Sequence, residues 1–481
     1  EGLRVVIAYD VREFRDFRER YVAQVANPLL QLSSRRLAEL SAQIYAANDV
    51  EVFIQPRLDE RYMSTPELSF AVRFHKAHGG LNVSASHNPP DDNGAKFYNA
   101  HGGQFVPPND SVLTERVEAV DVVQSLSWSD AVVSGRLRWL TGDAYNGYLE
   151  LVSGQSSSAP KGFSLVFTGL HGAGSWSVPP VLRRAGFEVL EEPSQAIADG
   201  TFATVPGRAP NPEIPACLDL ATTFADSVGC ELVLGTDPDA DRIGGCIKDK
   251  TGWQFLSGNE IATLVVYQAL KKHPNPANAI VMRTEVTTQL VSSIVQFYGA
   301  KEINNLLVGF KYIGDGIRQL EQHGIFEGVE GSAADFCIGV EESHGVLTTP
   351  ELRDKDAAGG ALLLAELAFE ASQRGCTLKD EFHDICTRHG FVANRLVSTV
   401  MRGVTGRQRI TAIMESLRSR PPKQVGISDV TGFTDHQDEN GPRGQSTSAT
   451  DLAARNVLVF QLGSGARLVV RPSGTEPKCK V

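Results

Sequence analysis

The chain has 481 residues, of which 42% are hydrophobic and 21% are charged, and it contains 45 glycines and 24 prolines. This composition is typical of a globular protein with several domains, and it excludes a single small module and a disordered or fibrous chain. Acidic residues outnumber basic residues by 57 to 46, and the net charge of -11 disfavours nucleic acid as a partner, because no positive field attracts a polyanion.

Short β-branched runs alternate with helical patterns through most of the chain. The predicted strands lie at residues 4–8, 81–84, 165–167, 232–234, 279–282 and 337–340. Helix-forming residues occupy nearly all faces of residues 261–270 and 361–370, as expected for helices that pack against a sheet. The alternation predicts an α/β fold with βαβ units around mixed or parallel sheets.

Two linkers and a change of pattern divide the chain. Residues 153–160 form a serine-rich linker, and residues 271–277 form a second boundary. Near the end, the strands at 457–462 and 466–470 flank a Gly-Ser-Gly turn and predict a β-hairpin in a smaller α+β domain. The predicted domains are three similar α/β units and a final α+β unit, at 1–157, 158–275, 276–390 and 391–481.

The cysteines and the apolar segments bear on location. Seven cysteines without a CxxC pair fit neither a disulfide framework nor a thiolate metal cluster, and they favour a reducing cytoplasm. No apolar run reaches the length of about 18 residues that spans a membrane, and no secretion signal precedes the first strand. We therefore expect a cytoplasmic protein with no membrane partner.

The first chemical motif is a serine loop at residues 84–96, Ser-Ala-Ser-His-Asn-Pro-Pro-Asp-Asp-Asn-Gly-Ala-Lys, which follows a predicted strand. Ser86 is a candidate nucleophile or phosphate carrier, and Lys96 offers positive charge to a phosphoryl group. The alternative is a polar turn in which the serine and asparagine side chains bond neighbouring amides.

The second motif places Asp237, Asp239 and Asp241 in a tight loop after an apolar strand. Alternate carboxylates can converge on one divalent cation, and without a cation they would repel one another. An EF-hand would need Gly and Glu where the sequence has Arg242 and Lys248, so an open Mg²⁺ site fits better than a closed Ca²⁺ cage. The alternative is a solvated acidic turn.

Two further loops carry groups that bind sugars and anions. Glu341 and Ser343 follow a predicted strand, where they can bond adjacent sugar hydroxyls, although a surface turn is an equal alternative. A loop from 471 to 477 combines a guanidinium, hydroxyls and glycine-exposed amides, which is the inventory of a phosphate cradle. Together the four loops predict phosphoryl transfer on a phosphorylated polyol.

These motifs, in this order and spacing, resemble the α-D-phosphohexomutase superfamily, which includes phosphoglucomutases and phosphomannomutases. Weaker agreements extend the resemblance over nearly the whole chain, at residues 64–66, 170–174, 308–311 and 353–356. The resemblance implies three α/β domains with mixed sheets and a smaller C-terminal α+β domain, all four arranged around a central cleft.

The resemblance also implies a role for each loop. Ser86 would carry the phosphoryl group as phosphoserine, and Lys96 would polarise that group and help manage the hydroxyl proton. Mg²⁺ would be held by the phosphate on Ser86 and by the three aspartates. The implied substrate-binding residues are His87, Arg242, Lys311, Glu341, Ser343, Arg471, Ser473, Gly474 and Thr475, the last four on the non-reacting phosphate.

The implied reaction interconverts hexose 1-phosphate and hexose 6-phosphate, of glucose or mannose, through a hexose 1,6-bisphosphate that also serves as activator. The same loops suit two alternatives, a hexose-1,6-bisphosphate synthase and a non-catalytic phosphosugar-binding protein. The Gly-Thr-Ser/Ala-Gly-Leu-Arg-Gly segment of the family, and the strand and helix that follow its phosphate loop, are not in this sequence, so we expect a chain incomplete at both ends. His344 receives no catalytic role, and the sequence leaves the oligomeric state and the general base open.

Overall fold

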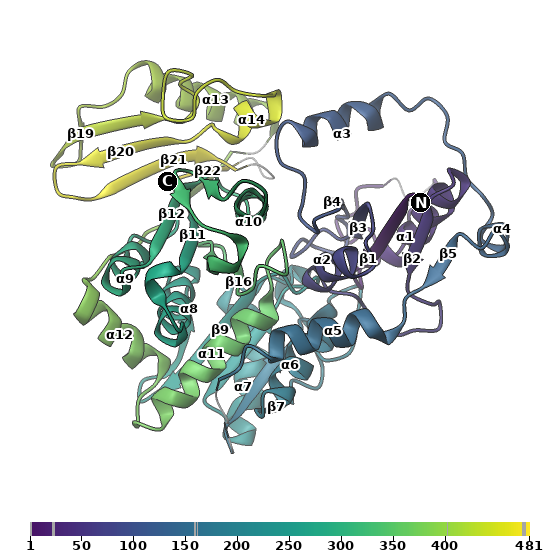
Figure 1. Cartoon of the computed structure of the whole chain (residues 1–481), viewed down its shortest axis with the longest axis horizontal. Coiled ribbons are helices and arrows are strands. Elements are labelled where there is room, and N and C mark those ends of the chain that lie inside the picture. The colour runs from purple at the N-terminus through teal and green to yellow at the C-terminus, as the bar shows by residue number, and fades with distance from the viewer. Residues whose placement is uncertain (1, 22–24, 158–159, 161, 402, 474–477) are drawn as a thin grey trace. The chain divides into compact units, whose positions relative to one another are not determined.

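The computed structural model describes residues 2–21, 25–157, 160, 162–401, 403–473 and 478–481. The chain forms two compact units (Figure 1). The first unit contains Glu1–Phe105 and Val122–Val392, and the second contains Val106–Asp121 and Ala393–Val481.

The first sheet of the first unit has the strand order β4-β3-β1-β2-β5, in which β4 alone is antiparallel to its neighbour. Alternate residues of β1 point to opposite faces, so that Val5 and Ile7 join the core under α1 while Val6 and Ala8 join the core under α2. The elements are β1 (Arg4–Tyr9), α1 (Ser34–Ala47), β2 (Glu51–Ile54), α2 (Thr65–Phe74), β3 (Gly79–Val83), β4 (Ala95–Asn99), α4 (Trp128–Val133), β5 (Leu137–Trp139) and α5 (Gly142–Ser153).

The second sheet has the order β10-β9-β8-β6-β7, with β6, β7 and β8 parallel and the other two strands antiparallel. Its faces are again covered on both sides, since Leu232 and Leu234 of β8 join one core cluster and Val233 joins another with α7. The elements are β6 (Ser164–Thr168), α6 (Val178–Arg184), β7 (Glu188–Glu191), α7 (Asp219–Val228), β8 (Leu232–Thr236), β9 (Ile243–Asp249) and β10 (Gly252–Leu256).

The third sheet has the order β12-β11-β15-β16, with an antiparallel edge strand β16. One core cluster continues from the second sheet through α8 and α11 into this sheet. A capping box between Ser257 and Glu260 begins α8. The elements are α8 (Gly258–Lys272), β11 (Ile280–Thr284), α9 (Leu290–Tyr298), β12 (Lys301–Leu306), α10 (Lys311–His323), β13 (Ile325–Phe326), β14 (Val329–Glu330), β15 (Phe336–Val340), β16 (Val346–Leu347), α11 (Ala357–Ser372) and α12 (Leu378–His389).

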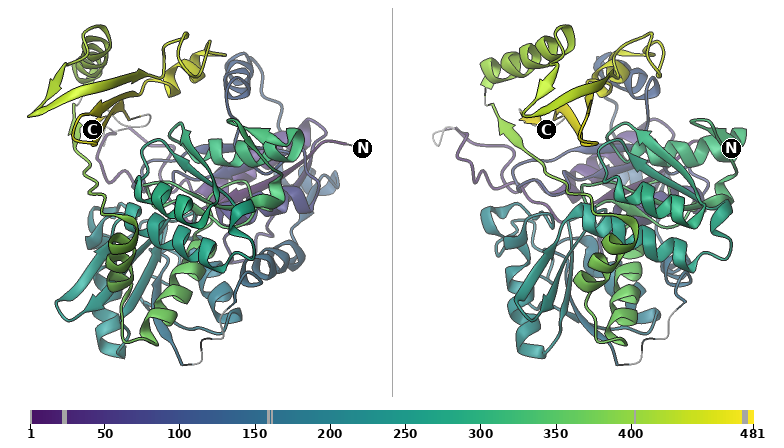
Figure 2. Two further views of the ribbon diagram at one scale, coloured as in Figure 1. Left: turned by 60° about the vertical axis from the view of Figure 1, so that its left-hand side comes forward. Right: turned by 90° about the vertical axis from the view of Figure 1, so that its left-hand side faces the viewer.

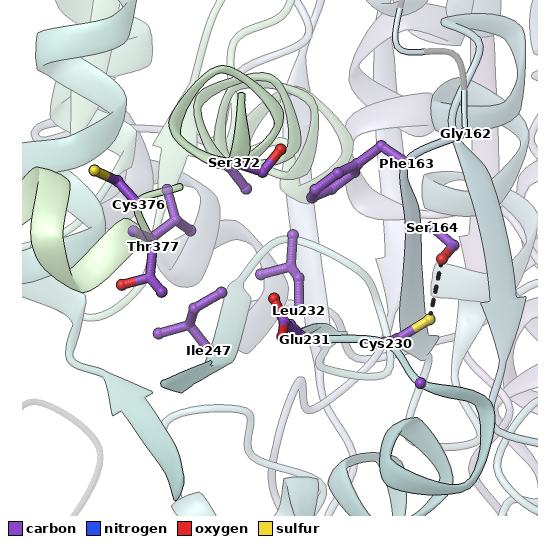
Figure 3. Close-up of a pocket in the computed structure, with 13 residues that line it drawn as sticks. Gly162, Phe163, Ser164, Cys230, Glu231, Leu232, Ile247, Ser372, Cys376 and Thr377 are labelled. Carbon is purple, nitrogen blue, oxygen red and sulfur yellow. Dashed lines mark hydrogen bonds between the residues drawn. The ribbon is translucent and has the colours of Figure 1, made fainter. Parts of the chain in front are cut away.

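A cavity of about 230 Å³ opens at the N-terminal end of β8, beside the end of α11 and the start of α12 (Figure 3). Phe163, Cys230, Ile247, Ser372 and Thr377 line it. The predicted aspartate loop follows the opposite end of β8, so this cavity contains none of the predicted site residues.

The second unit is a six-stranded sheet of order β17-β22-β21-β20-β19-β18, and α13 covers one of its faces (Figure 2). Strands β20 and β21 form the predicted hairpin, in which Leu458 pairs with Val470 and Gly465 has φ +83°. Asp110 and Thr450 are hydrogen-bonded at 2.7 Å, which ties α3 to α14. The elements are α3 (Asn109–Glu118), β17 (Ser398–Val400), α13 (Gly403–Ser419), β18 (Gln424–Val425), β19 (Ser428–Asp435), α14 (Ala449–Ala454), β20 (Leu458–Leu462), β21 (Arg467–Pro472) and β22 (Lys478–Lys480).

The predicted strands and helices are therefore confirmed, with ends that shift by a few residues, and so is the class of three α/β domains followed by a sheet-rich α+β domain. The exact domain boundaries stay a prediction. Within the described part of the chain, no helix combines the length and the apolar character needed to cross a membrane.

Candidate active site

The serine loop connects β3 to β4 and holds Ser86 in an unusual conformation. Ser86 has φ +50°, which a residue with a side chain adopts only where its surroundings hold it there. Its amide donates to Ser84 Oγ at 2.9 Å, and its carbonyl accepts from Arg12 Nη2 at 2.7 Å. The main chain of Ser86 is thus held on both sides.

The aspartate loop follows β8 and is fully buried. Asp237, Asp239 and Asp241 are each at most 1% exposed, and one ligand oxygen from each lies within 4.8 Å of the others. Asp237 Oδ1 accepts the amides of Asp241 and Arg242 at 3.1 Å, which closes the loop. The sequence prediction that these carboxylates converge is confirmed.

Glycines let neighbouring segments approach this loop. A side chain on Gly172 would meet Pro238 Cα at 2.2 Å, and one on Gly174 would meet Thr236 Oγ1 at 2.0 Å. The weak family agreement at residues 170–174 therefore has a physical cause, since only glycine allows this contact. Thr65, at the start of α2, likewise donates to Asp239 Oδ2 at 2.9 Å.

The serine and aspartate loops meet within the first unit. Ser86 Oγ donates to Asp237 Oδ2 at 2.5 Å, although the two residues are 151 positions apart. Lys96, on β4, places Nζ 2.6 Å from Asp239 Oδ2 and 3.4 Å from Asp241 Oδ2. The structure thus brings together the predicted carrier, the predicted lysine and the predicted metal ligands.

Burial and charge set the protonation of this cluster. Burial raises the pKa of Asp237 well above its usual range, and the neighbouring Asp241 and Asp239 add to that rise. Burial also opposes ionisation of Asp239 and Asp241, but Lys96 lowers the pKa of Asp239, and Lys355 together with Lys96 lowers the pKa of Asp241. An unscreened charge at Asp237 is therefore costly, and a bound cation would relieve it.

The same residues have the donors that a magnesium ion requires. Asp239 Oδ1 and Asp241 Oδ1 are buried oxygens without a hydrogen-bond partner, although their second oxygens bond lysines. Hard divalent cations bind carboxylate oxygens, and Mg²⁺ commonly keeps a position for a phosphate oxygen. This donor set fits Mg²⁺.

Glu341 and Ser343 lie in the loop of residues 341–345, the sugar loop, which joins the aspartate loop through the main chain. It lies between β15 and β16, and Gly345 forms a β-bridge with Arg242. His344 is buried, accepts at its carbonyl from Ile243 N, and places Nδ1 3.0 Å from Ile243 O. His344 therefore ties the two loops together.

Glu341 and Lys355 add two further titratable groups to the site. Burial raises the pKa of Glu341 to about 7, against the opposing effect of Lys355. Lys355 Nζ lies 3.1 Å from Asp241 Oδ2, so this lysine reaches the aspartate loop. The list of candidate residues derived from sequence omitted Lys355, although the weak agreement at 353–356 contained the signal.

Arg242 is paired with Glu213, which the sequence analysis also missed. Arg242 Nη1 contacts Glu213 Oε1 directly. The charge of Arg242 also acts on His87. Burial together with this charge lowers the pKa of His87 to about 4, so the ring is neutral at neutral pH. Its Nδ1 is 3.4 Å from Ser86 Oγ, which places His87 beside the candidate carrier.

The remaining predicted residues lie around or outside this cluster. Ser343 is half-buried in the sugar loop. Lys311 is the first residue of α10. The preceding residue, Phe310, contacts the site, since its ring centroid lies 5.5 Å from Lys355 Nζ. Arg471 is the penultimate residue of β21 in the second unit, and the amide of Ser473 donates to Lys478 O at 2.8 Å. Gly474 and Thr475 fall outside the described residues.

Models of the phosphoglucomutase/phosphomannomutase α/β/α domains I, II and III match residues 31–123, 146–252 and 257–389. A phosphoglucomutase of Staphylococcus epidermidis is 31% identical over 458 residues, which cover 93% of this chain and 80% of the relative. A phosphoglucomutase of Staphylococcus aureus is 30% identical over 471 residues, covering 95% and 82%.

Solved structures show the same fold. A phosphoglucomutase/phosphomannomutase family protein of Burkholderia thailandensis has a TM-score of 0.65 at 18% identity, with 99% of this chain and 84% of that chain covered. Parafusin, a phosphoglucomutase of Paramecium in its open form, has a TM-score of 0.66 at 17% identity, covering 100% and 82%. The chain therefore belongs to the phosphoglucomutase/phosphomannomutase family of the α-D-phosphohexomutase superfamily and is a phosphohexomutase, an isomerase that transfers phosphoryl groups.

Proposed function

We propose that this phosphohexomutase interconverts the 1-phosphate and 6-phosphate of glucose or mannose through phosphoserine at Ser86 and a hexose 1,6-bisphosphate. The contact between Ser86 Oγ and Asp237 carries the proposal, because it sets a hydroxyl against a buried carboxylate of the candidate metal loop. A protein that only binds phosphosugars needs no such hydroxyl. Hexose 1,6-bisphosphate is then also the activator, since it phosphorylates Ser86 when this residue carries no phosphoryl group.

Asp237, Asp239 and Asp241 would hold Mg²⁺ together with an oxygen of the phosphoserine. When bound, the ion supplies charge neutralisation to the phosphoryl group in transfer. Lys96 contributes on the protein's side, because Asp239 and Asp241 raise its pKa despite burial and keep Nζ positively charged beside the transferring group.

The transfer step exchanges one phosphorus–oxygen bond for another. The bond from phosphorus to Ser86 Oγ breaks as a sugar hydroxyl oxygen bonds to phosphorus, and the hydroxyl proton ends on Ser86 Oγ. Running the step backwards with the other phosphate of the bisphosphate returns the phosphoryl group to Ser86 and releases the isomer.

Substrate recognition is assigned to residues outside the cluster of Ser86, Lys96 and the three aspartates. Glu341 and Ser343 would bind sugar hydroxyls, and His87, Arg242 and Lys311 would contact the phosphosugar. The non-reacting phosphate would be held by Arg471, Ser473, Gly474 and Thr475, which offer a guanidinium, hydroxyls and amides.

The test is ³¹P NMR of the protein with Mg²⁺, trace hexose 1,6-bisphosphate, and glucose 1-phosphate or mannose 1-phosphate. Conversion to the 6-phosphate is expected, and Ser86→Ala should abolish it, because no other group carries the phosphoryl in this proposal. A Ser86→Ala variant with full activity would contradict the carrier assignment. Net accumulation of bisphosphate from 1,3-bisphosphoglycerate would instead identify a synthase, and binding without any conversion would identify a binding protein.

A further inference from the structure

A buried ion pair lies behind the serine loop, where the proposed chemistry does not use it. Arg12 is 0% exposed and Asp10 is 1% exposed, and Arg12 Nη1 lies 3.1 Å from Asp10 Oδ2. Both residues follow β1 at its C-terminal end. Burying an ion pair is costly, and a pair of apolar side chains of similar volume often stabilises a core at least as well. Its presence at this position therefore calls for a role beyond stability.

One side of the ion pair reaches the amide of Ser86. Asp10 Oδ2 accepts from Ser84 Oγ at 2.8 Å, and Ser84 Oγ in turn accepts from Ser86 N at 2.9 Å. Asp10 Oδ1 accepts from Ser34 Oγ at 2.5 Å and from the Arg12 amide at 3.0 Å. Both carboxylate oxygens are thus occupied, and one of them is linked through a single hydroxyl to the candidate carrier.

The other side of the ion pair reaches the carbonyl of Ser86. Arg12 Nη2 donates to Ser86 O at 2.7 Å and to Asn88 O at 2.8 Å. The guanidinium also lies over the ring of Phe202, 5.5 Å from its centroid, which limits its movement. Nη2 donates to both carbonyls while Nη1 faces Asp10 Oδ2, and a lysine ammonium, which has a single nitrogen, does not reproduce that arrangement.

The ion pair therefore holds both main-chain groups of a residue with φ +50°. For a non-glycine residue this left-handed conformation is unfavourable and persists where surrounding contacts impose it. We propose that Asp10 and Arg12 are positioning residues that fix the main chain of Ser86, so that Oγ stays against Asp237 during phosphoryl transfer. This inference rests on the proposed carrier role of Ser86, and it assigns to the pair no contact with substrate or metal.

Positioning makes a specific kinetic prediction. A displacement of about 1 Å at a reacting atom can lower a rate by about 10²-fold. Arg12→Lys keeps a positive charge next to Asp10 but loses the two-carbonyl contact, so kcat should fall by about 10- to 100-fold while KM for hexose phosphate stays within about twofold. Ser84→Ala removes the hydroxyl that links Asp10 to the amide of Ser86 and should lower kcat by a smaller factor.

The experiment follows transfer of the phosphoryl group from glucose 1,6-bisphosphate to dephosphorylated protein by rapid quench and intact-protein mass spectrometry. Arg12→Lys and Ser84→Ala are compared with the wild-type chain and with Arg283→Lys as a matched control. Arg283 is also buried, contacts Glu302, and donates to the carbonyls of Thr284 and Thr287, but it holds a different loop. Arg12→Lys and Ser84→Ala should slow phosphorylation of Ser86, whereas Arg283→Lys should lower the melting temperature without slowing it.

The outcomes separate the positioning role of Asp10 and Arg12 from the carrier role of Ser86. If Arg12→Lys and Ser84→Ala are both phosphorylated at the wild-type rate, the positioning role is overturned and the carrier role stands. If Arg283→Lys slows phosphorylation as much as Arg12→Lys does at equal loss of melting temperature, the ion pair acts through stability alone, and the inference is again overturned. If the wild-type chain takes no phosphoryl group, the proposed function fails, and this inference fails with it.

Discussion

The two units of the molecule place their functional groups in opposite environments. In the first unit the candidate transfer centre is buried, and its carboxylates and lysines are held by contacts that link the serine, metal and sugar loops. In the second unit a small hydrophobic cluster that includes Ile410, Leu458 and Phe460 supports the sheet, and Arg471 and Ser473 of the predicted phosphate loop are half-buried. Phosphoryl transfer depends on prepositioned charge, which the buried centre of the first unit provides.

The largest expected effect on activity comes from a change in the aspartate loop, which belongs to the first unit. Asp239→Asn removes the carboxylate that bonds Lys96 at 2.6 Å and offers a second oxygen to a cation, so kcat should fall by about 10²- to 10³-fold. Mg²⁺ should also increase protection from hydrogen exchange in β8 of the wild-type chain, leave β20 and β21 unchanged, and have no effect on the variant. Hydrogen exchange with mass spectrometry and steady-state kinetics measure both.

The exposed Asp226, which pairs with Lys248 on the same sheet, provides the control for that prediction. Asp226→Asn should keep both the activity and the response to Mg²⁺. An equal response to Mg²⁺ in the two units, or an active Asp239→Asn variant, would remove the contrast between them.

How far the sequence predicts this site depends on the distance between partners. Ser86, Lys96 and the three aspartates were identified because each lies in a short motif, and the structure brings them together. Arg12 and Glu213 were missed because their meaning comes from partners 74 and 29 residues away, Ser86 and Arg242 respectively. A buried arginine and an exposed one look alike in a single sequence.

The same reasoning applies to the fold. Strands such as β8 were predicted because parallel strands buried on both faces appear as continuous apolar runs. The short edge strand β5, of which only the first residue is buried, has no such run. Residues 106–121 pack with the second unit through a contact between Asp110 and Thr450, which are 340 positions apart, and no local pattern indicates it.

An intermediate effect should distinguish the second unit by its response to acid. Burial, together with Arg443, lowers the pKa of His436 to about 4, and Arg443 Nε donates to His436 Nδ1 at 3.0 Å. Between pH 6.5 and 4 the unfolded histidine binds a proton that the folded one does not, so stability present above pH 6.5 is lost as the pH falls towards 4. The linked loss is at most about 3 kcal/mol.

Hydrogen exchange in β19 and β20 measured from pH 7 to pH 4 tests this response, after correction for the intrinsic pH dependence of exchange. His436→Gln keeps an acceptor for Arg443 but does not titrate, so its protection should change less over this range than that of the wild-type chain. Identical pH dependence in both proteins would show that His436 does not set the acid response of the second unit.

The smallest effect tests whether the second unit is stabilised by its own sheet. Gly465 lies in the turn between β20 and β21 with φ +83°, and a side chain there would meet no atom within 4 Å, so the cost of Gly465→Ala is conformational and about 1 kcal/mol. Protection from exchange in β20 and β21 should fall by about fivefold, because 1.4 kcal/mol corresponds to tenfold. Gly463→Ala is the matched control, since Gly463 does not have positive φ and its new side chain would make only ordinary contacts with Thr431 and Asp429. If Gly465→Ala also lowered protection in β8, the two units would unfold together, and the contrast between them would not extend to their stability.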